Sequence, residues 1–74
     1  MREYCEILHA LREDNDKKQV ELAELLNVSQ SYYSKYEKGI RELPIHHLIT
    51  LCKYYNVSAD YILGLPKNLE YPER

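Results

Sequence analysis

The chain has 74 residues, a length that fits one small domain and excludes enzymes in which a nucleotide-binding fold stands beside a substrate domain. Its residues are 45% hydrophobic and 30% charged, which indicates a compact soluble chain rather than a disordered or fibrous one. The formal net charge of −2 counts, taken alone, against binding to nucleic acid.

The two cysteines, Cys5 and Cys52, are far apart in the sequence and form no CxxC pair. No secretory signal segment precedes them, and no apolar run approaches the roughly 18 residues of a membrane span. Reduced thiols are the default for such a chain. We therefore expect a cytoplasmic protein that does not enter a membrane.

Residues 3–15 predict an amphipathic helix, because Tyr4, Ile7, Leu8 and Leu11 gather on one face at about 100° per residue. Arg12 lies inside the same apolar arc, where a charged group needs a partner.

A second helix is expected to begin at Lys17 or Lys18 and to end before Asn27, a residue that tolerates left-handed geometry. Asp16 and Gln19 have the spacing of a capping box at its start. Val28 then indicates a buried anchor.

A third helix is predicted from Ser29, its N-cap, to about Lys38, with Gly39 ending it. Its helical wheel divides into two arcs, with Glu37 at the boundary. The polar arc contains Gln30, Ser31, Ser34, Lys35 and Lys38, and the opposite arc contains Tyr32, Tyr33, Tyr36 and Ile40.

A fourth helix is expected to begin with Pro44 at its first position and to end near Asn56. Its predicted inward residues are Ile45, Leu48, Ile49, Leu51, Cys52 and Tyr55, and its predicted outward residues are His46, His47, Lys53 and Tyr54. A last helix over 58–63 ends at Gly64. We expect one all-α domain over residues 1–66, followed by a polar tail over 67–74.

Residues 19–39 form the most informative unit, two short helices joined by a tight turn. Such a unit suits reading of the DNA major groove, because one helix crosses the phosphate backbone and the other presents polar side chains to base edges. The alternative is an ordinary helical hairpin in an all-α domain.

At these residues the sequence resembles the phage-repressor/Cro-type helix-turn-helix family. The residues that carry the resemblance are Leu8, Leu11, Arg12, Gln19, Leu22, Ala23, Asn27, Val28, Ser29, Glu37, Gly39, Pro44, Leu48 and Asp60 to Gly64. They cover roughly residues 4–65. The resemblance implies a compact five-helix, lambda-repressor-like DNA-binding domain, and a transcriptional regulator, expected to be a repressor, that acts as a homodimer on a two-fold operator.

Carried over onto this chain, the family's base-reading positions fall on Gln30, Ser31 and Lys35. A glutamine amide pairs with adenine, and a lysine donates to guanine O6 and N7. The predicted contacts to the DNA backbone are Lys17, Lys18, Gln19, Ser29, Tyr32, Ser34, Lys38 and Arg41. For Tyr32, a half-buried core ring is an equally good interpretation.

Three residues depart from the family pattern at the start of the second helix. Asp16 stands where Gly is common, Lys17 where an apolar residue is usual, and Lys18 where Thr or Ser is usual. The stem of Lys17 is expected to lie along the core with its ammonium group in water.

The partner expected for Arg12 is Glu37, at the inner edge of the third helix. We predict a salt bridge between these two residues that ties the first helix to the reading helix; the family pattern implies the same pair. The alternative is that both side chains bend into water.

Other kinds of site are not favoured by the sequence. Cys5 and His9 share a helix face, but Cys5 and Cys52 fall on apolar arcs, so no metal site and no cofactor are predicted. We find no catalytic motif in the sequence, so no enzymatic function is predicted. The alternative function is a protein-interaction module on the same fold, such as an antitoxin or a co-regulator.

Overall fold

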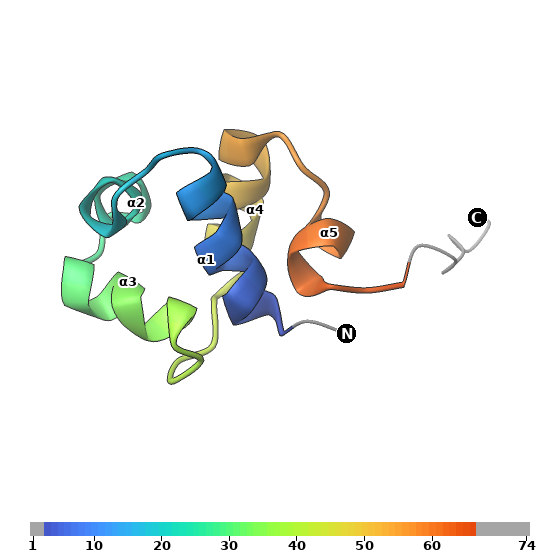
Figure 1. Cartoon of the computed structure of the whole chain (residues 1–74). Helices are drawn as coiled ribbons and strands as arrows, with labels where there is room; N and C mark the ends of the chain where they lie inside the picture. Colours follow the sequence, from blue (N-terminus) through green and yellow to red (C-terminus); the bar gives the residue numbers. More distant parts are fainter. Residues whose placement is uncertain (1–2, 67–74) are drawn as a thin grey trace.

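The computed structural model describes residues 3–66, which form five α-helices and no strand (Figure 1). The helices are α1 (Tyr4–Asp14), α2 (Gln19–Leu26), α3 (Gln30–Glu37), α4 (Ile45–Tyr55) and α5 (Ala59–Leu63). This confirms the predicted all-α, five-helix architecture, with helix boundaries within about two residues of the predicted ones. The predicted tail over 67–74 lies outside the described residues.

The central helix is α1, which packs against α3 on one side and α5 on the other (Figure 1). α2 packs against α3, and α4 packs against α5. The buried core residues are Ile7, Leu8, Leu11, Leu22, Ala23, Leu26, Tyr33, Tyr36, Leu51 and Ile62. Two rings of α3 are therefore among the largest core side chains, and they fix how this helix is rotated on the domain.

All five helices end in the same way, at a residue with left-handed backbone geometry. These residues are Asp16, Asn27, Gly39, Asn56 and Gly64, with φ values between 54° and 75°. In each case the next N–H donates, at 3.0 Å, to the carbonyl five residues earlier, as in a Schellman motif. Asn27 therefore has the predicted left-handed conformation, and the turn into α3 begins there.

The predicted capping box of Asp16 and Gln19 is wrong. Asp16 ends α1 with φ 54°, and the residue before α2 is Lys18, whose backbone N–H donates to Glu21 Oε2 at 2.9 Å. Asp is suited both to helix N-caps and to left-handed helix ends, so its type did not decide between the two positions.

The predicted inner face of α4 is wrong in its first turns. Ile45 and Ile49 are 75% and 50% exposed, whereas the His47 ring lies 6.1 Å from the buried Tyr36 ring, centroid to centroid. Pro44 is the N-cap rather than the first helical residue. Ile40, predicted on the apolar arc of the third helix, lies beyond its end and is exposed.

Candidate nucleic-acid interface

The turn between α2 and α3 is built by three consecutive residues. Asn27 has φ 58°, Val28 packs against the core, and Ser29 Oγ accepts a hydrogen bond from the Tyr32 backbone N–H at 3.1 Å. The Ser29 hydroxyl retains its own proton for donation to another acceptor. The small side chain of Ala23, 2% exposed, allows α2 and α3 to approach closely.

α3 has two chemically different faces, as its helical wheel predicted. Tyr33 and Tyr36 are buried on the inner face. The outer face of α3 consists of Gln30, Ser31, Ser34, Lys35 and Lys38, of which Ser34 and Lys35 are half-buried and the others are exposed. The three predicted base-reading residues therefore lie together on a helix whose opposite side is fixed by the core.

Glu37 holds the end of α3 to two other helices through its carboxylate. Arg12 of α1 donates from Nε to Oε2 at 2.8 Å and from Nη2 to Oε1 at 3.1 Å. Gln19 of α2 donates from Nε2 to Oε1 at 3.3 Å, and His9 Nδ1 lies 2.9 Å from Oε1. These four residues form the Glu37 cluster, in which the structure brings the predicted pair of Arg12 and Glu37 together.

The Glu37 cluster is shielded from water, because the side chains of Glu37 and Arg12 are only 3% and 12% exposed. Burial alone would raise the pKa of the Glu37 carboxyl. Hydrogen bonds from its neighbours, Arg12 first, outweigh that effect and lower the pKa to about 2. Glu37 is therefore ionised at neutral pH and engaged within the domain.

The sequence did not identify His9 and Gln19 as partners of Glu37. His9 lies outside the apolar arc of α1, and its Nε2 also contacts Glu13 Oε1 at 3.0 Å. Gln19 was assigned to the DNA backbone, but its amide donates to Glu37. Only the packing of α1 and α2 on α3 brings these side chains to one carboxylate.

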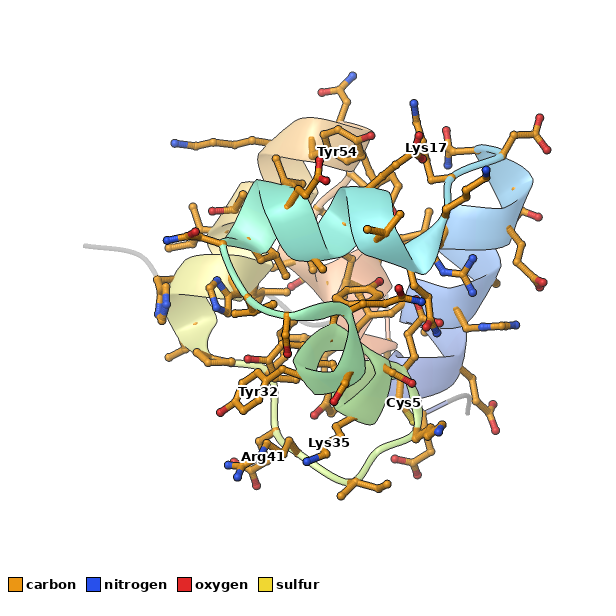
Figure 2. All side chains as sticks on the ribbon, turned by 90° about the vertical axis from the view of Figure 1, so that its left-hand side faces the viewer. Cys5, Lys17, Tyr32, Lys35, Arg41 and Tyr54 are labelled. Carbon is orange, nitrogen blue, oxygen red and sulfur yellow. The ribbon has the colours of Figure 1, made fainter. Side chains whose placement is uncertain are left out.

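Lys17 and Lys18, adjacent in sequence, differ in where their side chains lie. Lys17 is half-buried, and its Nζ lies 6.0 Å from the centroid of the Tyr54 ring. Figure 2 shows this pair beyond α2, away from the labelled residues around α3. Lys18 is exposed. The structure therefore places the Lys17 ammonium beside Tyr54, apart from the outer face of α3.

Tyr32 and Arg41 lie next to each other at the side of α3. The guanidinium carbon of Arg41 is 4.9 Å from the centroid of the Tyr32 ring. In Figure 2, Tyr32 lies to the left of α3, Arg41 lies below Tyr32, and Lys35 lies below the helix. This adds an exposed basic group beside Lys35.

Cys5 and Cys52, which the sequence places on apolar arcs, are free thiols and only half-buried. Cys5 Sγ lies 3.4 Å from the position that a Cβ on Gly39 would occupy, so it packs against the end of α3. Within residues 3–66, no three His, Cys, Asp or Glu side chains are grouped so as to hold a metal ion.

Residues 8–62 match a family model described as helix-turn-helix. The chain belongs to the helix-turn-helix family. The match includes the α2–turn–α3 unit and the Glu37 cluster, and it confirms the resemblance on which the sequence-based site was built. None of the helices within residues 3–66 has the length and apolar character needed to cross a membrane.

Two curated helix-turn-helix proteins of Bacillus subtilis (strain 168) are similar to this chain. The uncharacterized HTH-type transcriptional regulator YobD is 39% identical over 62 residues, which cover 84% of this chain and 55% of YobD. The HTH-type transcriptional regulator ImmR is 44% identical over 46 residues, which cover 62% of this chain and 36% of ImmR. The chain thus spans about half of one relative and about a third of the other.

Two solved structures share the helix-turn-helix fold of this chain. A transcriptional regulator from Listeria innocua has a TM-score of 0.84 and 28% identity, over 95% of this chain and 65% of that one. The P22 c2 repressor, solved in complex with a synthetic operator, has a TM-score of 0.76 and 27% identity, over 85% of this chain and 96% of that one.

Proposed function

We propose that this chain is a sequence-specific DNA-binding domain of a transcriptional regulator and that it docks α3 in the major groove. The observation that carries the proposal is the outer face of α3, where Gln30, Ser31 and Lys35 lie opposite the buried Tyr33 and Tyr36. A reading helix must present polar groups in a fixed orientation, because each base pair displays a distinct pattern of donors and acceptors.

Within this proposal, Gln30, Ser31 and Lys35 contact base edges, and a separate set of residues contacts phosphates. That set consists of Lys18, Gln19, Ser29, Ser34, Lys38 and Arg41. Gln19 lies at the N-terminus of α2, where backbone N–H groups and the helix dipole favour a phosphate, and its amide also holds Glu37. Of the predicted backbone contacts, Lys17 is left out because its ammonium lies by Tyr54, and Tyr32 because its ring faces the Arg41 guanidinium.

We further propose a repressor that binds a two-fold operator as a homodimer in the cytoplasm and performs no enzymatic step. The short reading helix covers few base pairs. A dimer that binds two half-sites multiplies the sequence selectivity that one half-site provides. A duplex with an inverted repeat should bind more tightly than a duplex with one half-site, with a protein-to-DNA ratio of two. Equal affinity and a ratio of one would contradict the dimer.

The direct test is in vitro selection of bound duplexes from a random pool, with the wild-type chain, Lys35→Ala and a control, Lys53→Ala. Lys53 is exposed in the last turn of α4, outside the α2–turn–α3 unit. The wild type and the control should select the same motif, whereas Lys35→Ala should relax the preference at one position of each half-site.

Two outcomes would contradict the proposal. An unchanged motif for Lys35→Ala would remove Lys35 from the base-reading set. Failure of the folded wild-type chain to retain any duplex at low salt would refute DNA binding and favour the alternative, a protein-interaction module.

A further inference from the structure

The contact between Arg41 and Tyr32 joins an exposed cation to the reading helix. Arg41 lies in the connection between α3 and α4, and its guanidinium carbon is 4.9 Å from the Tyr32 ring centroid. This distance lies within the range in which a cation is attracted to the face of an aromatic ring. Such a contact uses no N–H donor, so the five donors of the guanidinium group remain for an anion.

The Tyr32 ring is a fixed platform rather than a mobile surface group. It meets the Tyr36 ring edge to face, with centroids 5.5 Å apart and planes at 85°. Tyr36 is 1% exposed and contacts Tyr33 in the same manner at 6.2 Å. The orientation of Tyr32 is therefore set by the core behind α3.

The backbone of Arg41 is held at the same time by α1 and α3. The Arg41 N–H donates to the Lys35 carbonyl at 3.3 Å, and the Arg41 carbonyl accepts from Tyr4 Oη at 3.5 Å. Tyr4 Oη also accepts from the Leu43 N–H at 3.2 Å. With its backbone and its side chain both restrained, Arg41 loses less conformational freedom on binding an anion than an arginine on an unsupported loop.

We propose that Tyr32 is a positioning residue, whose ring holds the Arg41 guanidinium ready for a phosphate of the DNA backbone while Tyr32 itself makes no contact with DNA. This inference rests on the proposed DNA-binding function. The guanidinium group matches phosphate in bidentate geometry, and Figure 2 shows it on the same side of α3 as Lys35. This proposal replaces the direct contact between Tyr32 and the DNA backbone that the sequence predicted.

The test is a double-mutant cycle with Tyr32→Leu, Arg41→Gln and the double variant, measured as affinity for one fixed duplex over a range of salt concentrations. Tyr32→Leu should weaken binding roughly two- to fivefold, the factor that corresponds to an exposed cation–π contact. Arg41→Gln should weaken it further and reduce the slope of log affinity against log salt by about 0.9 per subunit. The double variant should bind no more weakly than Arg41→Gln, because Tyr32 acts only through Arg41.

The conservative variant Tyr32→Phe separates the ring from its hydroxyl. It keeps the platform, so it should bind with wild-type affinity and wild-type salt dependence. Loss of affinity in Tyr32→Phe would assign the contact to the hydroxyl and overturn the proposal. An equal effect of Tyr32→Leu with and without Arg41 would also overturn it, since Tyr32 would then act on DNA or on the fold directly.

Thermal unfolding of every variant distinguishes positioning from a loss of structure. If Tyr32→Leu fails to fold, Tyr32→Phe and Arg41→Lys still decide, because Arg41→Lys retains the charge and loses the planar fork. The Arg41→Lys variant should keep the wild-type slope of log affinity against log salt but bind more weakly. Unchanged affinity would contradict the proposal. If the wild type does not bind DNA, the proposed function fails, whereas wild-type binding without coupling refutes this inference alone.

Discussion

Glu37 is the residue on which three helices converge through hydrogen bonds. Its carboxylate accepts from Arg12 of α1 and Gln19 of α2, and His9 of α1 lies beside it. A buried carboxylate is tolerated only when its charge is paired and its lone pairs are used. The Glu37 cluster meets both conditions at the C-terminal end of α3, so it fixes the reading helix against the domain.

Replacement of Arg12 by Met should lower the free energy of unfolding by about 3 kcal/mol, because a buried carboxylate then loses its cation. Urea denaturation at pH 7 measures the change. The control is Lys53→Met, which removes a charge from an exposed position and should change the stability by less than about 0.5 kcal/mol. Equal stabilities for the two variants would contradict a structural role for the pair.

The depressed pKa of Glu37 predicts a specific loss of stability in acid. The pKa falls from an ordinary value of 4.5 to about 2 on folding, so the ionised form stabilises the folded state by about 3 kcal/mol above pH 4.5. This stabilisation declines as the pH falls below 4.5 and is lost once it falls through 2. The unfolding free energies of the wild type and Glu37→Gln should therefore converge over that range. A constant difference between them would contradict the shift.

At the scale of helices, the shared left-handed ending explains how five elements fit into a short chain. Each helix ends at or just before a left-handed residue where the chain reverses, and after α2 and α4 the next residue returns to the core. Val28 and Val57 pack there as apolar anchors. Lys17 occupies the equivalent position after α1, and its half-buried side chain reaches Tyr54. The aliphatic part of Lys17 thus takes the place that Val28 and Val57 have in the other turns, while its ammonium group stays near the surface.

Two glycine substitutions test this ending at α1, and each removes one negative charge. Asp16→Gly should leave stability unchanged or raise it by up to about 1 kcal/mol, because glycine adopts φ 54° without steric cost. Asp14→Gly lies inside the last turn of α1 and should lower stability by about 0.5–1 kcal/mol. Thermal unfolding compares the two; destabilisation by Asp16→Gly would show that its side chain, rather than its backbone geometry, matters.

The sequence predicted the helices well because their signals are local. Ser29 caps α3 as predicted, Ser58 caps α5 through the same kind of hydrogen bond, and Asn27 adopts the predicted geometry. The inner face of α4 was predicted less well. A helical wheel gives the direction of Ile45 and Ile49, but whether another helix covers that direction depends on the packing of the whole chain.

The candidate site, like the helices, was predictable where its signals are local. The wheel of the third helix separated its outer face from its core face, and the position of Arg12 among apolar residues pointed to Glu37. Three other tertiary contacts were not predicted, because no residue in them stands out from its local pattern as Arg12 does: His9 with Glu37, Lys17 with Tyr54, and Arg41 with Tyr32.

At the scale of the whole molecule, the net charge of −2 conceals an uneven distribution. Residues 17–41 contain five basic and three acidic residues, and the rest of the chain contains five basic and nine acidic ones. Glu37 is engaged by Arg12, and the Lys17 ammonium lies by Tyr54. Within residues 17–41 the cations left for DNA are therefore Lys18, Lys35, Lys38 and Arg41, whereas the net negative charge of the rest of the chain repels phosphate.

This distribution predicts the salt dependence of DNA binding. The three cations assigned to phosphates, Lys18, Lys38 and Arg41, give a slope of log affinity against log salt of about −2.7 per subunit, because each neutralised phosphate contributes about −0.9. The matched variants Lys38→Met and Lys17→Met both remove a charge and keep an apolar stem. Lys38→Met should reduce the slope by about 0.9 per subunit, and Lys17→Met should leave it unchanged. A reduced slope for Lys17→Met would show that its ammonium leaves Tyr54 for a phosphate, and the basic surface would then extend around the start of α2.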